Sequence, residues 1–264
     1  MNALSAQFLS DYAAHRAAEG RGYSGAALRA LPYLKTGPFA EQWAVRAKSF
    51  DAFVQHVVRP MARIHVGPLK VLDLGAGNGW LCHRLAQLGH KAIALDIRDD
   101  DVDGLAAASE FSKGIPNLFE CVRASFDDLP FEIARFDIAV FNASLHYARD
   151  LHLVLQEAAR VIRRGGLLVI LDSPFYDNEA GGAAMVTEKQ AQSAAYFGMR
   201  ANTLLAPNFI EFLTRDRLAA AAPNLAWSRK RVLYPLWYEL RPLMARLRGK
   251  RAPSRFDLWM ARVP

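Results

Sequence analysis

The stretch from Lys70 to Ile97 constrains the fold of this chain more than any other. It begins with the apolar run Val71 to Leu74, which has the character of a buried parallel strand. A loop with glycine at alternate positions follows, and then a helix from about Trp80 to Leu88. Ala92 to Asp96 forms a second strand that ends on a carboxylate. This order predicts an α/β fold in which the loop brings bare N–H groups against a ligand, beside a helix N-terminus.

The glycine loop distinguishes between two cofactor classes. A nicotinamide or flavin fingerprint needs glycine in the last place of G-x-G-x-x-G, but that place is occupied by Trp80. The loop also follows an acid, giving D-L-G-A-G-N-G from Asp73 to Gly79. This segment resembles the E/D-x-G-x-G-x-G motif of class I S-adenosylmethionine-dependent methyltransferases. The alternative is a glycine-rich turn in some other α/β fold.

The resemblance implies both a fold and a cofactor site. The fold is α/β, a Rossmann-like open sheet of seven strands in the order 3-2-1-4-5-7-6, with strand 7 antiparallel and helices on both faces. The loop backbone would approach the methionine part of S-adenosylmethionine, Asp73 would face its ammonium group, and Asp96 would accept hydrogen bonds from its ribose. The cofactor-binding residues expected in this stretch are Asp73, Gly75, Ala76, Gly77, Gly79, Asp96 and Ile97. No metal site is expected.

The adenine contact is expected after the third strand. Asp99 to Glu110 is acidic at its start and rich in alanine afterwards, which predicts a helix, and Leu118 to Val122 predicts the strand. The segment from Arg123 to Phe131 resembles the G-D-A-E-D-L-P-F segment of small-molecule methyltransferases. Ser125 stands where that family has the acid that accepts from the adenine amino group. The resemblance implies that Ser125 accepts this bond and that Phe126 packs on the ring, with Asp127 as a compensating acid. The alternative is that the acids of this segment form a solvated turn.

The fourth strand, Phe136 to Phe141, ends in a tip that bears on the chemistry. Enzymes that methylate nucleobase nitrogens commonly carry N/D-P-P-Y/F at this tip, and the sequence from Asn142 to Leu145 lacks it. The tip instead resembles the L-H-H or L-H-Y segment of lipid, quinone and small-metabolite methyltransferases. Asn142 is expected at the cofactor. His146 is the candidate base for the acceptor's proton, although a histidine here could also pack under the cofactor or cap the next helix.

A helix is predicted from Gln42 to Val58, ahead of the glycine loop. Arg46 lies on its apolar face, and an arginine on such a face needs an anion. In similar families a helix in this position covers the cofactor, which makes Arg46 a candidate for the methionine carboxylate. The alternatives are an arginine that snorkels from the edge of the stripe and an arginine paired with a structural carboxylate. We expect residues 1–60 to form a helical cap and residues 61–264 to form the methyltransferase domain.

The remaining elements are predicted from periodicity and from turn residues. The first twenty-five residues predict a loosely docked helix, with Leu4, Phe8, Tyr12 and His15 at helical spacing. After the fourth strand come a helix over 150–164, ended by two glycines, and a strand over 167–172. The segment 175–207 is expected to be a lid or substrate wall, because its insertion from 177 onward is too long for a simple connection. Strands over 227–233 and 255–263, with a helix over 237–247 between them, complete the sheet.

Charge is concentrated near the C-terminus. The chain has 264 residues and a net charge of +7, and residues 227–251 hold eight Lys or Arg against one Glu. In the helix over 237–247, apolar residues recur at three- and four-residue spacing beside cations. This helix could bury its apolar stripe in the core, or it could bring the enzyme to an anionic membrane surface.

Composition narrows the location and the partners. There is no run of 18 apolar residues and no charged-then-apolar leader, so neither a membrane span nor a secretory signal is expected. Two cysteines give no disulfide framework, which favours the cytoplasm.

The function predicted is transfer of a methyl group from S-adenosylmethionine to oxygen or carbon of a small-molecule or lipid-like acceptor. The alternatives are a nucleic-acid methyltransferase, favoured by the basic segment and disfavoured by the tip after strand 4, and a cofactor-binding protein without catalysis. The oligomeric state is left open by the sequence.

Overall fold

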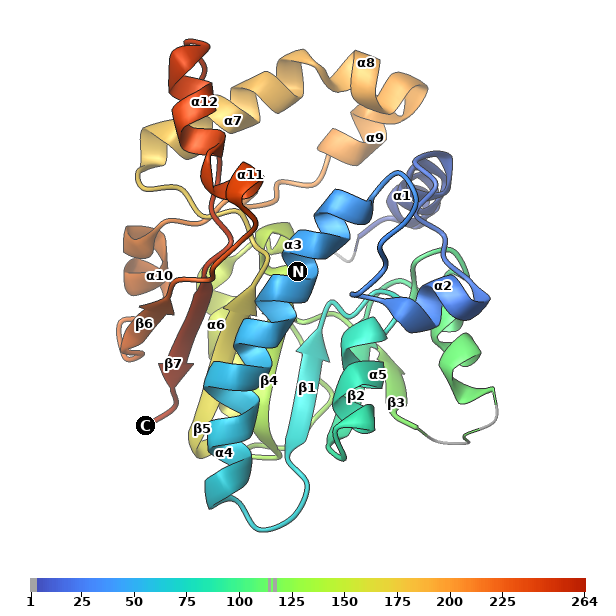
Figure 1. Ribbon diagram of the computed structural model, residues 1–264, viewed down its shortest axis with the longest axis vertical. Helices are drawn as coiled ribbons and strands as arrows, with labels where there is room; N and C mark the ends of the chain where they lie inside the picture. Colours follow the sequence, from blue (N-terminus) through green and yellow to red (C-terminus); the bar gives the residue numbers. More distant parts are fainter. Residues whose placement is uncertain (1–3, 114, 116–117) are drawn as a thin grey trace.

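A seven-stranded sheet runs through the centre of the computed structural model, which describes residues 4–113, 115 and 118–264 (Figure 1). The strand order is β3-β2-β1-β4-β5-β7-β6. Strands β1 to β5 are parallel, and β7 runs antiparallel to both β5 and β6. The predicted sheet order and the antiparallel seventh strand are confirmed. The strands are β1 (Lys70–Leu74), β2 (Lys91–Asp96), β3 (Glu120–Arg123), β4 (Phe136–Asn142), β5 (Ile162–Leu171), β6 (Trp227–Lys230) and β7 (Leu258–Arg262).

Helices cover both faces of the sheet and its carboxyl-terminal edge (Figure 1). The α-helices are α1 (Ala6–Ala18), α2 (Gly25–Ala30), α3 (Ala40–Phe53), α4 (Arg59–Ile64), α5 (Trp80–Gln87), α6 (Leu151–Val161), α7 (Glu179–Ala191), α8 (Ser193–Phe197), α9 (Ala201–Leu205), α10 (Arg215–Ala221), α11 (Leu236–Glu239) and α12 (Arg241–Leu247). A π-helical turn, η1 (Val54–Val58), and the 3-10 turns η2 (Leu105–Ser112), η3 (Leu145–Tyr147) and η4 (Gly198–Arg200) complete the set.

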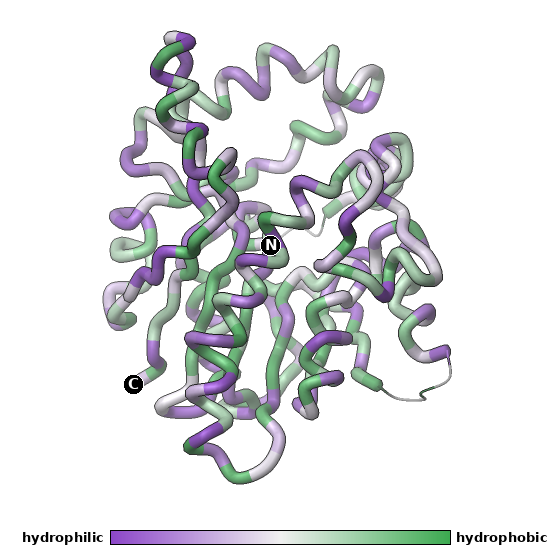
Figure 2. The backbone as a smooth tube through the Cα atoms, in the orientation of Figure 1, coloured by the Kyte–Doolittle hydropathy of each residue, from purple (hydrophilic) through white to green (hydrophobic). Residues whose placement is uncertain are grey.

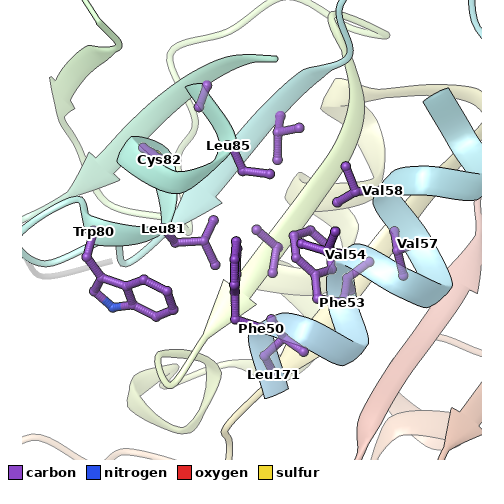
Figure 3. Packing of buried hydrophobic residues seen from close by; sticks show 14 of the residues in the cluster. Phe50, Phe53, Val54, Val57, Val58, Trp80, Leu81, Cys82, Leu85 and Leu171 are labelled. Carbon is purple, nitrogen blue, oxygen red and sulfur yellow. The ribbon is translucent and has the colours of Figure 1, made fainter. Parts of the chain in front are cut away.

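Two apolar clusters hold these layers together. Because side chains alternate along a strand, Ile138 and Val140 of β4 pack into one cluster, and Ala139 and Phe141 pack into the other. The first cluster lies under α3, η1, α4 and α5, and the second lies under α6 and α10. Figure 3 shows how the apolar side chains of α3 and η1 meet those of α5 in the first cluster.

The helix predicted over 42–58 is longer than expected. It runs through α3, the π-helical turn η1 and α4, from Ala40 to Ile64. Its buried face was predicted correctly, since Trp43, Phe50 and Phe53 are buried. Because α3 packs against β5 and β7, it belongs to the same packed core as the sheet. The division of the chain at residue 60 stays a prediction.

The helix predicted over 99–110 is wrong for its first half. Residues 99–104 form a turn, and only the 3-10 turn η2 follows. The cause is local, because the carboxylate of Asp100 accepts hydrogen bonds from the backbone N–H groups of Val102 and Asp103, at 3.2 and 3.0 Å. Such side-chain bonds compete with helix formation. The third strand is also displaced from the predicted 118–122 to β3.

The two glycines predicted to end the helix over 150–164 lie inside β5 instead. Helix α6 ends at Val161, and Ile162 already pairs with Phe136 across a register shift in β4 and β5. At Gly166 a Cβ atom would lie 2.7 Å from the carbonyl oxygen of Asp137, so the close approach of the strands requires glycine. The final strands β6 and β7 are shorter than predicted because their ends leave the ladder.

The apolar stripe predicted in the C-terminal helix is not in the core. The segment consists of α11 and α12, which stand away from the sheet in Figure 1, and green and purple alternate along them in Figure 2. Leu236 is 81% exposed and Leu247 is 72% exposed, and Trp237, Leu240, Leu243 and Met244 are also exposed. Of the two interpretations of this helix, burial in the core is therefore wrong. Within the described ranges, no helix is long and apolar enough to cross a bilayer.

Candidate active site

A cavity of about 810 Å³ opens at the carboxyl ends of β1, β2, β4 and β5. Parallel α/β sheets bind ligands at this edge, where the strand order reverses between β1 and β4. Helices α1 and α3 supply further walls. Most residues predicted to bind cofactor or acceptor line this single cavity, namely Arg46, Gly75, Ala76, Gly77, Asp96, Ile97, Ser125, Phe126, Asn142 and His146.

The glycine loop is shaped for close approach. Gly75 has φ +77°, and a Cβ atom there would lie 2.4 Å from the Cβ of Ser144. The Ser144 hydroxyl donates to the carbonyl of Leu74 at 2.5 Å, which ties the tip of β4 to the end of β1. Gly77 also has positive φ, at +55°. A side chain at either glycine would be strained, and at Gly75 it would also collide with the β4 tip, so the bare loop is required there.

Asp96 is held in place by the loop beside it. One carboxylate oxygen accepts from the N–H of Gly77 and the other from the N–H of Arg98, each at 2.8 Å. Burial raises the pKa of Asp96, and the two backbone bonds oppose this shift. Each oxygen keeps a free lone pair, so the carboxylate can still accept from a diol in the cavity.

The side predicted to bind adenine has the expected residues in place. Ser125 and Phe126 line the cavity, and Phe126 contacts Phe141 edge-on with ring centroids 5.8 Å apart. Asp127 also lines it, with a carboxylate oxygen 3.9 Å from the guanidinium of Arg149. An aromatic face and several acceptors are therefore available to a flat heterocycle.

Two predicted residues do not line the cavity. Asp73 is fully buried behind the loop, where its Oδ2 accepts from the Cys82 thiol at 3.8 Å. Burial raises the pKa of Asp73 to about 8, and nearby Asp96 adds to the shift. Gly79, with φ +77°, is the N-cap of α5, and a Cβ atom there would lie 3.0 Å from the ring of Phe119. Asp73 and Gly79 therefore support the loop from behind.

The tip of β4 supplies two polar groups. Asn142 and His146 line the cavity, and neither the Asn142 Oδ1 nor the His146 Nδ1 has a hydrogen-bond partner within the part of the chain that the structure describes. Burial lowers the pKa of His146 to about 3, helped by the cations Lys189 and Arg46. The imidazole is therefore neutral at physiological pH.

Arg46 lies on the cavity wall and forms no salt bridge with a described residue, although the buried carboxylate of Asp172 lies near enough to act on its pKa. Its guanidinium carbon is 5.0 Å from the ring centroid of Trp43. Burial lowers the pKa of Arg46, although a guanidinium stays charged at neutral pH. Because Asp172 acts on this half-buried guanidinium without forming a salt bridge to it, Arg46 can still pair with a carboxylate bound in the cavity.

Helix α1 contributes residues that the sequence analysis did not assign to the site. The hydroxyls of Tyr12 and Tyr147 lie 2.9 Å apart, and Arg16 donates to Asp103 at 2.9 Å. All four residues line the cavity. The helical spacing of Phe8 and Tyr12 indicated an apolar face but not what it covers. Contrary to the loosely docked helix that we predicted, α1 is tied to the site by polar contacts.

Asp172 was also missed. It follows β5 directly and lines the cavity. A signal for it was present in the sequence, because Asp172 follows its strand much as Asn142 and Asp96 end theirs.

The insertion predicted as a lid lies outside the cavity wall. Residues 177–207 are all described, and none of them lines the cavity. The insertion packs on α1 instead, where the Tyr196 hydroxyl donates to Glu19 at 2.6 Å. Lys189 of α7 donates to Glu211, whose backbone N–H donates to the carbonyl of His146. The insertion therefore backs the helix and the tip that do line the site, and a role as lid stays a prediction.

Comparison with known proteins matches this geometry. Residues 72–170 match the family model described as a methyltransferase domain. The chain carries the domain of S-adenosylmethionine-dependent class I methyltransferases. S-adenosylmethionine is accordingly the cofactor of this domain, and the resemblance inferred from the loop motif is confirmed.

Three relatives illustrate how widely acceptors vary. A sarcosine/dimethylglycine N-methyltransferase from Halorhodospira halochloris is 34% identical over 39% of this chain and 37% of its own length. A tRNA 5-carboxymethoxyuridine methyltransferase from Escherichia coli is 29% identical over 47% of this chain and 46% of its own. These alignments span less than half of either relative. The solved structure of geranyl diphosphate C-methyltransferase from Streptomyces coelicolor, with S-adenosylhomocysteine bound, shares the fold over 100% of both chains, with a TM-score of 0.60 and 14% identity.

Proposed function

We propose that this chain transfers a methyl group from S-adenosylmethionine to oxygen or carbon of a small-molecule or lipid-like acceptor. The observation that carries the proposal is the single cavity that joins the glycine loop and Asp96 to the tips of β4 and β5. A cofactor on β1 and β2 and an acceptor over β4 and β5 would share one cavity. Methyl transfer from a sulfonium needs mainly alignment of this kind.

The residues of this chain fit the cofactor. Asp96 keeps acceptor capacity for a ribose diol, Phe126 offers a ring for adenine, and Ser125 lies beside it. Gly75, Ala76 and Gly77 would lie along the methionine part, with Arg46 as the cation for its carboxylate. Asn142 has a free amide oxygen nearby. A direct contact with Asp73 is not part of the proposal, since that carboxyl lies behind the loop. The cofactor, when bound, supplies an electrophilic methyl group.

The shape of the site favours a small acceptor. The cavity has the size of a small-molecule site, and α1 forms one of its walls, joined to the β4 tip by the contact between Tyr12 and Tyr147. A base within a folded nucleic acid would have to reach the cofactor past this wall. The E. coli relative acts on tRNA, and the basic C-terminal segment keeps a nucleic-acid acceptor as the second candidate. Salt-sensitive retardation of RNA in a gel would favour this second candidate.

The exposed α11–α12 segment supports a lipid-like acceptor reached at a membrane surface. Arg246, Arg248 and Lys250 form no ion pair with any described residue, and they flank the exposed leucines of α12. A cationic and apolar helical surface of this kind binds anionic bilayers. A cytoplasmic location is part of the same proposal, and it is supported by the free thiols of Cys82 and Cys121.

Calorimetry tests the cofactor assignment. S-adenosylhomocysteine should bind and raise the melting temperature, because a ligand selective for the native state stabilises it by mass action. Asp96→Ala should weaken binding by roughly 10-fold or more, the scale of a lost hydrogen bond to a charged group. Asp177→Ala removes an exposed carboxylate and serves as the control. Binding of NAD in place of S-adenosylhomocysteine would overturn the assignment.

A further inference from the structure

Asp172 lies where the acceptor should be. The ribose carboxylate Asp96 ends β2, and Asp172 follows β5, with β1 and β4 between these two strands. Three strand spacings of about 4.8 Å place the two ends roughly 14 Å apart. A cofactor whose ribose lies on β2 points its methyl group toward the β4 tip, so the far side of the methyl group is the space over β5.

Hydrogen bonds from other segments hold one oxygen of the Asp172 carboxylate in place. The Ser49 hydroxyl of α3 donates to its Oδ1 at 2.5 Å and lies 2.8 Å from the hydroxyl of Tyr234. The Tyr234 hydroxyl in turn donates to the carbonyl of Phe256 at 2.6 Å. Asp172 itself has φ +49°, an unusual backbone conformation for a residue other than glycine. A chain of hydrogen bonds through three other segments, with Ser49 as the direct donor, thus holds one oxygen of this side chain.

The other oxygen has no partner. Asp172 is 6% exposed, and its Oδ2 forms no hydrogen bond with any residue of the ranges 4–113, 115 and 118–264. A buried carboxylate oxygen without a donor costs free energy, and such groups concentrate at functional sites. Because Asp172 lines the cavity, a ligand there can supply the missing donor.

We propose that Asp172 binds the hydroxyl group of the acceptor and takes its proton during methyl transfer. This inference rests on the proposed function and narrows the acceptor to an alcohol or a phenol. The acceptor oxygen forms a bond to the methyl carbon as the bond from sulfur to that carbon breaks. The electron pair of the broken bond stays on sulfur, and the hydroxyl proton goes to the Oδ2 of Asp172. Charge and atoms balance without another reactant.

The charges around the site favour Asp172 over His146 as the base. Burial raises the pKa of Asp172 to about 6, while Arg46 and the Ser49 hydroxyl oppose the shift. Tyr234 and Tyr238 are the other titratable groups coupled to it. The pKa of His146 is lowered to about 3. A base is most effective when its pKa lies near the working pH, so His146 is left as a neutral hydrogen-bonding group.

The test uses methyl-labelled S-adenosylmethionine and a panel of phenols, alcohols, amines and isoprenoid alkenes. We expect label on oxygen. Asp172→Asn should lower kcat about 100-fold or more while leaving the affinity for S-adenosylhomocysteine within 3-fold, which is the pattern of a lost proton acceptor. In the wild type kcat/KM should rise with pH up to about 6, and this rise should vanish in Asp172→Asn. Asp177→Asn removes an exposed carboxylate and serves as the matched control.

If Asp172→Asn fails to fold, Ser49→Ala provides a second test. Freeing Oδ1 should lower kcat about 10-fold and keep the rise with pH, as expected of a positioning residue. His146→Ala should change kcat less than Asp172→Asn does. Label on nitrogen or carbon, no labelled product despite cofactor binding, or full turnover by Asp172→Asn would each overturn the role of Asp172. Failure to bind S-adenosylhomocysteine would instead remove the proposed function itself.

Discussion

The side chain of Asp73 points away from the site because of the pleat of β1. Alternate residues of a strand face opposite sides, so Asp73 shares the side of Val71, where α5 packs. The sequence motif places an acid two residues before the loop but does not specify which way it faces. Asp73 therefore affects the stability of the fold, because burial favours the protonated form of its carboxyl group over the carboxylate.

This preference predicts a stability change with pH. The pKa of Asp73 is about 8 in the folded chain against 3.8 as its ordinary value, so the native state binds more protons between these pH values. The contribution of Asp73 to the free energy of unfolding therefore falls as pH rises from about 4 to 8. Asp73→Asn should stabilise the cofactor-free protein by a few kcal/mol more at pH 8 than at pH 5. Thermal melts at both pH values measure this, with Asp177→Asn as control. An equal gain at both pH values would contradict it.

At the scale of elements, the periodicity of the sequence could not determine what surrounds α11 and α12. Apolar residues at helical spacing predict a face that will be covered, but they do not say by what. Here the described chain leaves Leu236, Leu243 and Leu247 exposed.

Vesicle co-sedimentation tests whether a membrane covers them. The wild type should bind anionic vesicles at low salt and neutral vesicles weakly. Changing Arg246, Arg248 and Lys250 to Gln should weaken binding roughly 100-fold, since each cation near such a surface is worth about 1 kcal/mol. Changing Leu243 and Leu247 to Ser should weaken it even at low salt. Arg59→Gln, Arg63→Gln and Arg164→Gln together remove three exposed cations of α4 and β5 and provide the charge-matched control. Equal binding to neutral vesicles, or none at low salt, would leave a soluble metabolite as the better acceptor.

For the whole molecule, the parts predicted correctly are those encoded in short stretches. The glycine loop, Asp96 and the tip of β4 each lie at the carboxyl end of a strand, and a resemblance to one family supplied the sheet order. The missed parts depend on contacts between distant segments. Tyr12 meets Tyr147 across 135 residues, and Ser49 meets Asp172 across 123. No local pattern encodes such a pair, so the contribution of α1 to the cavity and the position of Asp172 on its wall could be found only from the structure.

The ion pair between Arg16 and Asp103 ties α1 to the loop after β2, and this contact should affect how fast the cofactor enters and leaves the site. Because α1 forms part of the cavity wall, breaking this ion pair should let the helix move away from the site more often, and we expect this to raise the rates of both cofactor entry and release. Arg16→Gln should speed both association and release of S-adenosylhomocysteine about 10-fold in stopped-flow experiments, with a smaller change in Kd. Lys48→Gln, an exposed cation of α3, should change neither rate. If instead only release accelerates, Arg16 binds the cofactor directly. If both rates change together, movement of α1 limits how fast the cofactor exchanges, and S-adenosylhomocysteine stays bound until that helix moves.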